Sequence, residues 1–194
     1  MGCGSSKFHV NASVKMKILR TADSCLKNLP DCNFEPHYMT ITDDDGTEIR
    51  IHSIDEHPRN AEPILLMHGN TSWSYIYRKI IPLLLQSGRH VIAGDLAELG
   101  RSDKPAKKIY YPLARHINWM EKWLHANALE NVTLFSQDWG RVIGLNLVVD
   151  NPARFDRIVA ANTGVPQGDG GHFIQEDKPD ELVEDIISFL ELSK

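Results

Sequence analysis

The segment "SQDWG" at 136–140 has the spacing of a turn that presents a nucleophile. It stands between an apolar run at 131–137, typical of a buried strand, and a helical pattern at 140–151. Small residues on either side of the central position let the backbone turn sharply, so the central side chain stands clear at the start of the helix. That side chain is Asp138. The spacing therefore predicts a carboxylate nucleophile.

A carboxylate at this position suits attack on an alkyl carbon. It displaces a halide or opens an epoxide, and it becomes an ester in the process. Water must then attack the ester carbonyl, and that step needs a histidine base. The backbone N–H groups of Trp139 and Asn70 are the expected donors to the oxyanion. The alternative role for Asp138 is a helix N-cap, but the surrounding turn favours the nucleophile.

Strands and helices alternate along most of the chain. The expected strands are 37–42 and 48–54, which form a hairpin, and then 63–69, 90–96, 131–137 and 157–164; the expected helices are 73–88, 114–129, 140–151 and 178–192. Alternation of this kind is typical of βαβ units around a parallel sheet. We therefore expect an α/β fold in which the nucleophile follows one of the central strands.

Several segments together resemble the haloalkane dehalogenases of the α/β-hydrolase superfamily. The motifs that carry the resemblance are "MHGN" at 67–70, "GRSDKP" at 100–105, "QDWG" at 137–140 and "GHFIQED" at 171–177, in this order. The resemblance extends from about residue 18 to the end of the chain. It implies an α/β-hydrolase core, with a mostly parallel sheet and helices on both faces.

Membership of this family implies a role for four residues. Asp138 is expected to be the nucleophile and His172 the general base. Trp139 is expected to donate its indole N–H to the leaving halide, and Asn70 to provide the second halide-binding side chain, as in some branches of the family. The resemblance implies no cofactor and no metal, since Asp, His and water suffice. The expected substrate is a small halogenated or epoxide-like organic molecule.

The chain departs from the family pattern in its second half. The family has a helical cap domain and further strands after the segment that reads "NTGVPQGDG" here, at 162–170. In this chain that segment runs directly into "GHFIQED", so we expect a truncated core without cap and late strands, interrupted between about 170 and 171. A smaller departure is "DLAELG" at 95–100, where the family usually has "DL.GFG".

The missing segment also carries the acid that orients His172. Asp169, Glu176 and Asp177 lie near His172 in the sequence and are the candidate replacements. The leading hypothesis is a haloalkane dehalogenase-like hydrolase that is impaired in this short form. One alternative is an epoxide hydrolase-like enzyme, which uses the same Asp–His chemistry but needs cap tyrosines. The other is a catalytically inactive α/β-hydrolase that acts as a binding module.

The amino terminus, "MGCGSSK", contains a lipidation pattern. Gly2 followed by Ser6 fits N-myristoylation, and Cys3 is placed for palmitoylation. Two acyl chains anchor a protein stably, whereas one binds a membrane only marginally. We expect a flexible leader at 1–15 and the hydrolase domain at 16–194, in the cytoplasm or anchored on the cytoplasmic face of a membrane. The alternative is a leader without lipid.

Composition narrows the classes of protein further. The net charge of −5 and the scattered basic residues give no reason to expect nucleic acid as a partner. Three cysteines without a regular spacing fit a reducing compartment better than a disulfide framework. No His or Cys spacing indicates a metal site. The oligomeric state is left open by the sequence.

Overall fold

A six-stranded sheet forms the centre of the computed structural model, which describes residues 16–56, 61–106, 111–161 and 173–192. In spatial order its strands are β2 (His37–Thr42), β3 (Glu48–Glu56), β5 (His90–Gly94), β4 (Pro63–Met67), β7 (Val132–Gln137) and β8 (Phe155–Ala161). The pairs β2–β3 and β3–β5 are antiparallel, and β5, β4, β7 and β8 are mutually parallel. The carboxyl ends of the four parallel strands therefore meet at one edge of the sheet.

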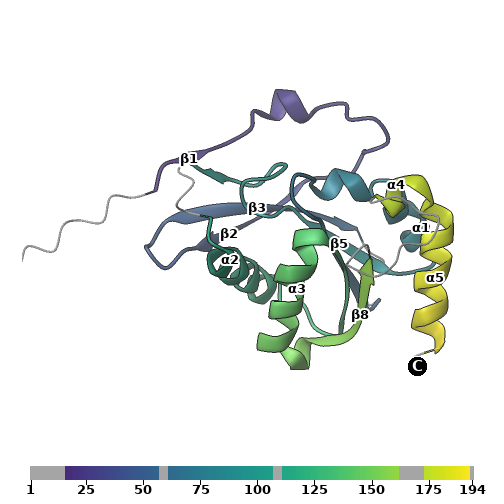
Figure 1. Ribbon diagram of the computed structural model, residues 1–194. Helices are drawn as coiled ribbons and strands as arrows, with labels where there is room; N and C mark the ends of the chain where they lie inside the picture. The colour runs from purple at the N-terminus through teal and green to yellow at the C-terminus, as the bar shows by residue number, and fades with distance from the viewer. Residues whose placement is uncertain (1–15, 57–60, 107–110, 162–172, 193–194) are drawn as a thin grey trace, which may run out of the picture.

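Four helices cover the sheet, two on each face (Figure 1). They are α1 (Ile80–Gln86), α2 (Leu113–Ala126), α3 (Asp138–Asp150) and α5 (Pro179–Leu192). The smaller elements are η1 (Asp23–Leu26), η2 (Ser74–Tyr77), η4 (Pro152–Arg154) and α4 (Ile174–Asp177), with a short ladder between β1 (Ile18–Leu19) and β6 (Lys104–Pro105). Helices α2 and α3 share one apolar core with the sheet, and α1 and α5 share the other.

Strand β4 shows how the sequence builds both cores. All five of its residues are buried. Leu65 and Met67 belong to the core under α2 and α3, whereas Ile64 and Leu66 belong to the core under α1 and α5. Successive side chains of a strand point to opposite faces, so a parallel strand covered on both faces reads as one continuous apolar run.

The expectation of a single helix over 73–88 is wrong. The structure has the short helix η2 and then a separate helix, α1, which begins at Ile80. Pro82 explains the break, because proline has no N–H to donate and its ring conflicts with the carbonyl four residues earlier, that of Arg78. Proline is tolerated only in the first turn of a helix, which is where Pro82 lies.

None of the helices that the structure describes is long and apolar enough to cross a membrane.

Candidate functional site

Asp138 lies at the tip of the turn between β7 and α3. Its φ angle is 48°, in the left-handed region, and the preceding Gln137 is extended, with φ −138° and ψ 157°. A non-glycine residue in the left-handed region costs about 1–3 kcal/mol, and it persists where the surrounding structure holds it there. The backbone changes direction sharply at this strained residue. The Asp138 side chain is therefore half-buried, whereas the side chains of β7 are buried.

Two glycines make room for this turn. A Cβ atom on Gly140 would lie 2.2 Å from the carbonyl oxygen of Met67 and 2.4 Å from that of His68. A Cβ atom on Gly69 would lie 2.5 Å from the Cβ of Asp138. Both contacts are impossible for a larger residue, so α3 begins in direct contact with the end of β4 and the loop that follows it.

We expect Gly140→Ala to destabilise the protein by ~2–3 kcal/mol, because the new methyl group meets backbone oxygens that cannot move aside. Gly144→Ala is the matched control on the same helix. Its nearest neighbours would be the side-chain tip of Leu134 at 2.9 Å and the sulfur of Met67 at 3.2 Å, and alanine gains ~1 kcal/mol of helix propensity. Urea unfolding measures both variants. Equal midpoints would contradict the packing argument.

The loop after β4 supplies a hydrogen-bond donor to Asp138. The backbone N–H of Asn70 donates to Oδ1 of Asp138 at 2.9 Å. The backbone N–H of Trp139 lies in the first turn of α3, where helix N–H groups have no acceptor within the helix. The positive end of the helix dipole also favours negative charge at this point. The arrangement can therefore stabilise charge on one carboxylate oxygen, and none of the described residues donates a hydrogen bond to the other.

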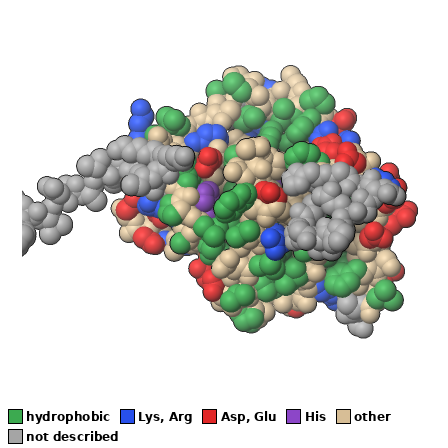
Figure 2. Space-filling view, in the orientation of Figure 1, with side chains coloured by type: hydrophobic (Ala, Val, Ile, Leu, Met, Phe, Trp, Pro, Cys, Tyr) green, Lys and Arg blue, Asp and Glu red, His purple; other side chains and the backbone are tan. Residues whose placement is uncertain are grey.

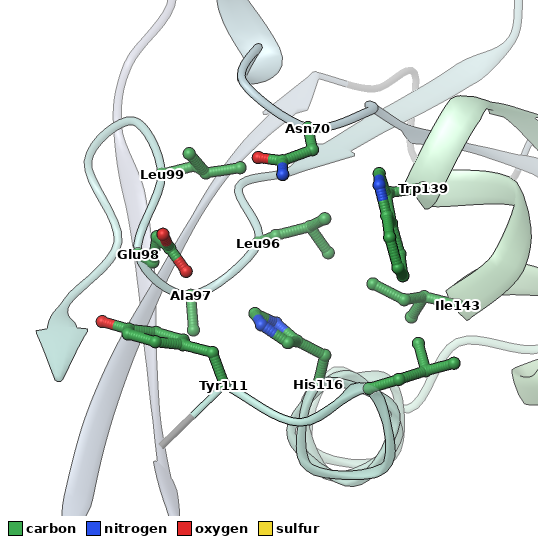
Figure 3. A pocket seen from close by; sticks show the side chains of 10 residues that line it. Asn70, Leu96, Ala97, Glu98, Leu99, Tyr111, His116, Trp139 and Ile143 are labelled. Carbon is green, nitrogen blue, oxygen red and sulfur yellow. The ribbon is translucent and has the colours of Figure 1, made fainter. Parts of the chain in front are cut away.

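Asn70 and Trp139 both line a pocket of 260 Å³ (Figure 3). The indole nitrogen of Trp139 lies at the same end of this pocket as Asn70, and 46% of the Trp139 surface is exposed. The Asn70 side-chain oxygen accepts the N–H of Thr71 at 3.0 Å. Its amide nitrogen is left to face the pocket, as Figure 3 shows. Two N–H donors thus lie at the same end of the pocket.

A buried carboxylate, Asp95, holds the loops around the site. It follows β5 and is fully buried. Its Oδ1 accepts the N–H of Ser74, and its Oδ2 accepts the N–H of Arg101 and hydrogen-bonds to Nδ1 of His52, each at 2.8 Å. Burial raises the pKa of Asp95, but the hydrogen bond from His52, together with the Arg101 N–H, holds the net pKa below its usual value. Sequence reasoning missed this role because it placed Asp95 inside the expected strand 90–96, whereas β5 ends at Gly94.

His68 is a second residue that the sequence did not single out, and its role is structural. Its Nε2 accepts the backbone N–H of Leu96 at 3.0 Å, and its Nδ1 donates to the carbonyl of Gly69 at 2.8 Å. Burial lowers the pKa of His68, so the ring is held neutral. Both ring nitrogens are engaged, and His68 positions the loop of Gly69 rather than acting as a base.

Several predicted residues lie outside the described part of the chain. They are Gly2, Cys3, Asp169 and His172. Of the candidate acids near His172, Glu176 is described, and it is already bound to two cations. It forms a bidentate ion pair with Arg78 and a contact of 3.0 Å with Nζ of Lys79. Burial raises the pKa of Glu176, but these partners lower it by more.

Within the described residues no group of three or more His, Cys, Asp or Glu side chains is arranged to hold a metal ion.

The fold and the turn are those of an α/β hydrolase, and the chain belongs to the alpha/beta hydrolase fold family, which residues 62–179 match. Among curated proteins it is similar to a haloalkane dehalogenase of Psychrobacter cryohalolentis, 55% identical over 154 residues, which cover 79% of this chain and 51% of that protein. A haloalkane dehalogenase of Mycolicibacterium paratuberculosis is 44% identical over 151 residues, covering 78% and 50%. The resemblance to haloalkane dehalogenases is confirmed.

A solved structure supports the same relationship. The tetrameric haloalkane dehalogenase DpaA from Paraglaciecola agarilytica superposes with a TM-score of 0.69 and 34% identity, over 79% of this chain and 53% of that chain. The predicted α/β-hydrolase core, with a mostly parallel sheet and helices on both faces, is confirmed. The chain spans about half the length of the curated relatives it matches.

Proposed function

We propose that this chain is a haloalkane dehalogenase-like hydrolase in which Asp138 forms an alkyl ester with its substrate. The observation that supports it most is the strained turn at Asp138, with one carboxylate oxygen bound by the Asn70 N–H at 2.9 Å. Active sites are where residues in rare backbone conformations concentrate. A pocket with the Asn70 and Trp139 side chains at one end lies beside this turn.

In the first step, Oδ2 of Asp138 attacks the carbon that carries the halogen. Its electron pair forms the C–O bond as the C–halogen bond breaks, and the halide leaves with the bonding pair. The side-chain N–H groups of Trp139 and Asn70 stabilise the halide as its charge develops. Oδ1 becomes the ester carbonyl oxygen, so the Asn70 backbone N–H then serves as an oxyanion donor.

In the second step, water attacks the carbonyl carbon of the ester. His172 takes a proton from the water as the water oxygen bonds to the carbonyl carbon, and returns it to the substrate oxygen as the ester C–O bond to that oxygen breaks, so the alcohol leaves. Asp138 then loses its remaining proton to solvent and is regenerated as a carboxylate. We propose that this step is slow here, because the cap, the late strands and their orienting acid are missing between about 170 and 171. Loss of the orienting acid costs on the order of 10⁴ in rate in a serine protease. Glu176 is a poor replacement because it is committed to Arg78 and Lys79.

Intact mass spectrometry with 1-bromohexane tests the proposal, with bromide measured in parallel. We expect the mass of the chain to increase by one hexyl group, with about one bromide released per chain, since the second step is slow. Circular dichroism and a cooperative thermal transition establish that the sample is folded.

The other outcomes are equally decisive. Many bromides per chain without an adduct would contradict the slow second step, and an alternative acid would then be required. Neither adduct nor bromide from a folded sample would contradict the proposed function and favour a binding module. An adduct with styrene oxide but none with 1-bromohexane would favour the epoxide hydrolase alternative.

Membrane attachment is a separate part of the proposal. It depends on the "MGCGSSK" pattern alone. We expect expression in a eukaryotic cell with an alkyne-tagged myristate to label the full chain, and Gly2→Ala to remove the label. Cys3→Ser is expected to keep the myristate label while the protein moves from the membrane fraction to the soluble fraction. Absence of label on the wild-type chain would contradict this part.

A further inference from the structure

The pocket beside the turn has a polar side that halide binding does not explain. Its apolar lining is Leu96, Ala97, Leu99, Leu113 and Ile143. Figure 3 shows Glu98 and Tyr111 on the opposite side of the pocket from Trp139 and Ile143. In the space-filling view this part of the surface, over α2 and α3, exposes hydrophobic side chains with acidic ones among them (Figure 2). A carboxylate thus faces the pocket from across the halide-binding end.

The backbone holds Glu98 in this place at a cost. Its φ angle is 82°, in the region that glycine adopts most readily. The Glu98 N–H donates to the carbonyl of Asp103 at 2.9 Å, which fixes the loop after β5 in this conformation. A strained non-glycine residue that lines a pocket is a reason to look for a function.

The charge of Glu98 is poorly compensated within the described structure. Glu98 is exposed, and its partial burial still raises the pKa of its carboxyl, while the charge of Lys104 lowers it. The Lys104 amine donates to the carbonyls of Gly100 and Ser102, at 2.9 and 2.8 Å, rather than to the carboxylate. Glu98 is exposed at the edge of the pocket, and no described residue forms a hydrogen bond or ion pair with its carboxylate, so the carboxylate is available to attract a cationic ligand that enters the pocket.

The remaining polar groups of the pocket do not oppose a cation. Burial lowers the pKa of His116, so its ring is neutral. The Tyr111 hydroxyl donates to the carbonyl of Pro105. Burial, and to a smaller extent the charge of Glu98, raises the pKa of Tyr111 to about 12, so its hydroxyl carries no charge. The Tyr111 and Trp139 rings add aromatic surface of the kind that attracts alkylammonium groups.

We propose that Glu98 makes this pocket selective for haloalkanes that carry an ammonium or quaternary ammonium group at the end remote from the halogen. The inference rests on the proposed function. The halogen lies at the Asn70 and Trp139 end, and the cation lies between Glu98 and Tyr111. Glu98 is a specificity-determining residue in this arrangement and takes no part in bond breaking.

A matched pair of bromides tests the selectivity. (3-Bromopropyl)trimethylammonium and 1-bromo-4,4-dimethylpentane have the same shape and differ by one positive charge. We expect wild type to alkylate Asp138 faster with the cation, and Glu98→Gln to reduce the ratio of the cationic rate to the neutral rate about tenfold. Glu98→Gly, which relieves the backbone strain, is expected to lose the preference as well. An unchanged ratio in both variants would overturn the inference.

Binding of the two product alcohols separates this inference from the proposed function. NMR titration with (3-hydroxypropyl)trimethylammonium and with 4,4-dimethylpentan-1-ol requires no chemistry. We expect Glu98→Gln to weaken binding of the cation about tenfold and to leave the neutral alcohol unaffected. If neither bromide alkylates the folded wild type but this difference in binding is found, the proposed function fails and the cation site stands. Equal binding of the cation to wild type and variant would overturn the site in either case.

Discussion

Asp138→Ala and Asp138→Gly are both expected to lose all adduct formation with 1-bromohexane. In the proposed mechanism the Asp138 carboxylate forms the new bond, and none of the N–H groups around it can replace a nucleophile. Intact mass measures the loss. A hexyl adduct of unchanged yield on either variant would locate the reactive group elsewhere.

The same two variants are also expected to differ in stability, and the sign of the difference tests the backbone conformation at Asp138. Glycine inside a helix is ordinarily about 1 kcal/mol less favourable than alanine. At a φ of 48° the order reverses, because the left-handed conformation costs an alanine ~1–2 kcal/mol and costs glycine almost nothing. We therefore expect Asp138→Gly to be more stable than Asp138→Ala by ~1 kcal/mol in urea unfolding. The opposite order would mean that Asp138 is not held in the strained conformation in solution.

Asp95→Ala is expected to destabilise the protein by ~3–5 kcal/mol, the range for removing one partner of a buried charged network. The N–H groups of Ser74 and Arg101 and the ring of His52 would lose their acceptor in the interior. Asp44→Ala is the control, since the Asp44 side chain is 75% exposed and pairs with Lys122 at the surface. Such pairs contribute about 0–1 kcal/mol. Similar losses in the two variants would contradict the role of Asp95.

The pH dependence of stability gives a second measure of Asp95. Its pKa is lowered in the folded protein, so its contribution is complete above the unfolded pKa of about 3.9 and is lost as the pH falls through the lower folded pKa. The difference in unfolding free energy between wild type and Asp95→Asn is therefore expected to shrink between about pH 4 and pH 2. Urea unfolding over this range measures it. A difference that is constant with pH would contradict a lowered pKa.

The elements of the fold could be predicted from local patterns. The hairpin of β2 and β3 follows from two alternating segments around a turn at Gly46, and the structure pairs them antiparallel. The run at β4 is apolar throughout because both of its faces are buried. Such patterns depend on neighbours within a few residues, which is why the sequence alone suffices for them. The helix at 73–88 failed because Pro82 outweighed a continuous apolar pattern.

The motif "QDWG" likewise indicated the family from the sequence alone, and it predicts a carboxylate nucleophile. The tertiary structure alone decided what surrounds it. The N–H of Asn70 reaches Asp138 across 68 residues of sequence, and Gly140 is required by the carbonyl oxygens of Met67, at the end of β4, and of His68, which follows it.

The buried role of Asp95 and the place of Glu98 in the pocket were also decided by the tertiary structure. These contacts arise because β4 lies between β5 and β7, which brings three loops to one edge of the sheet. Strand order is set by the summed packing of many distant residues. Local periodicity does not encode strand order, so the sequence predicts the reactive group, whereas only the fold determines which residues surround it.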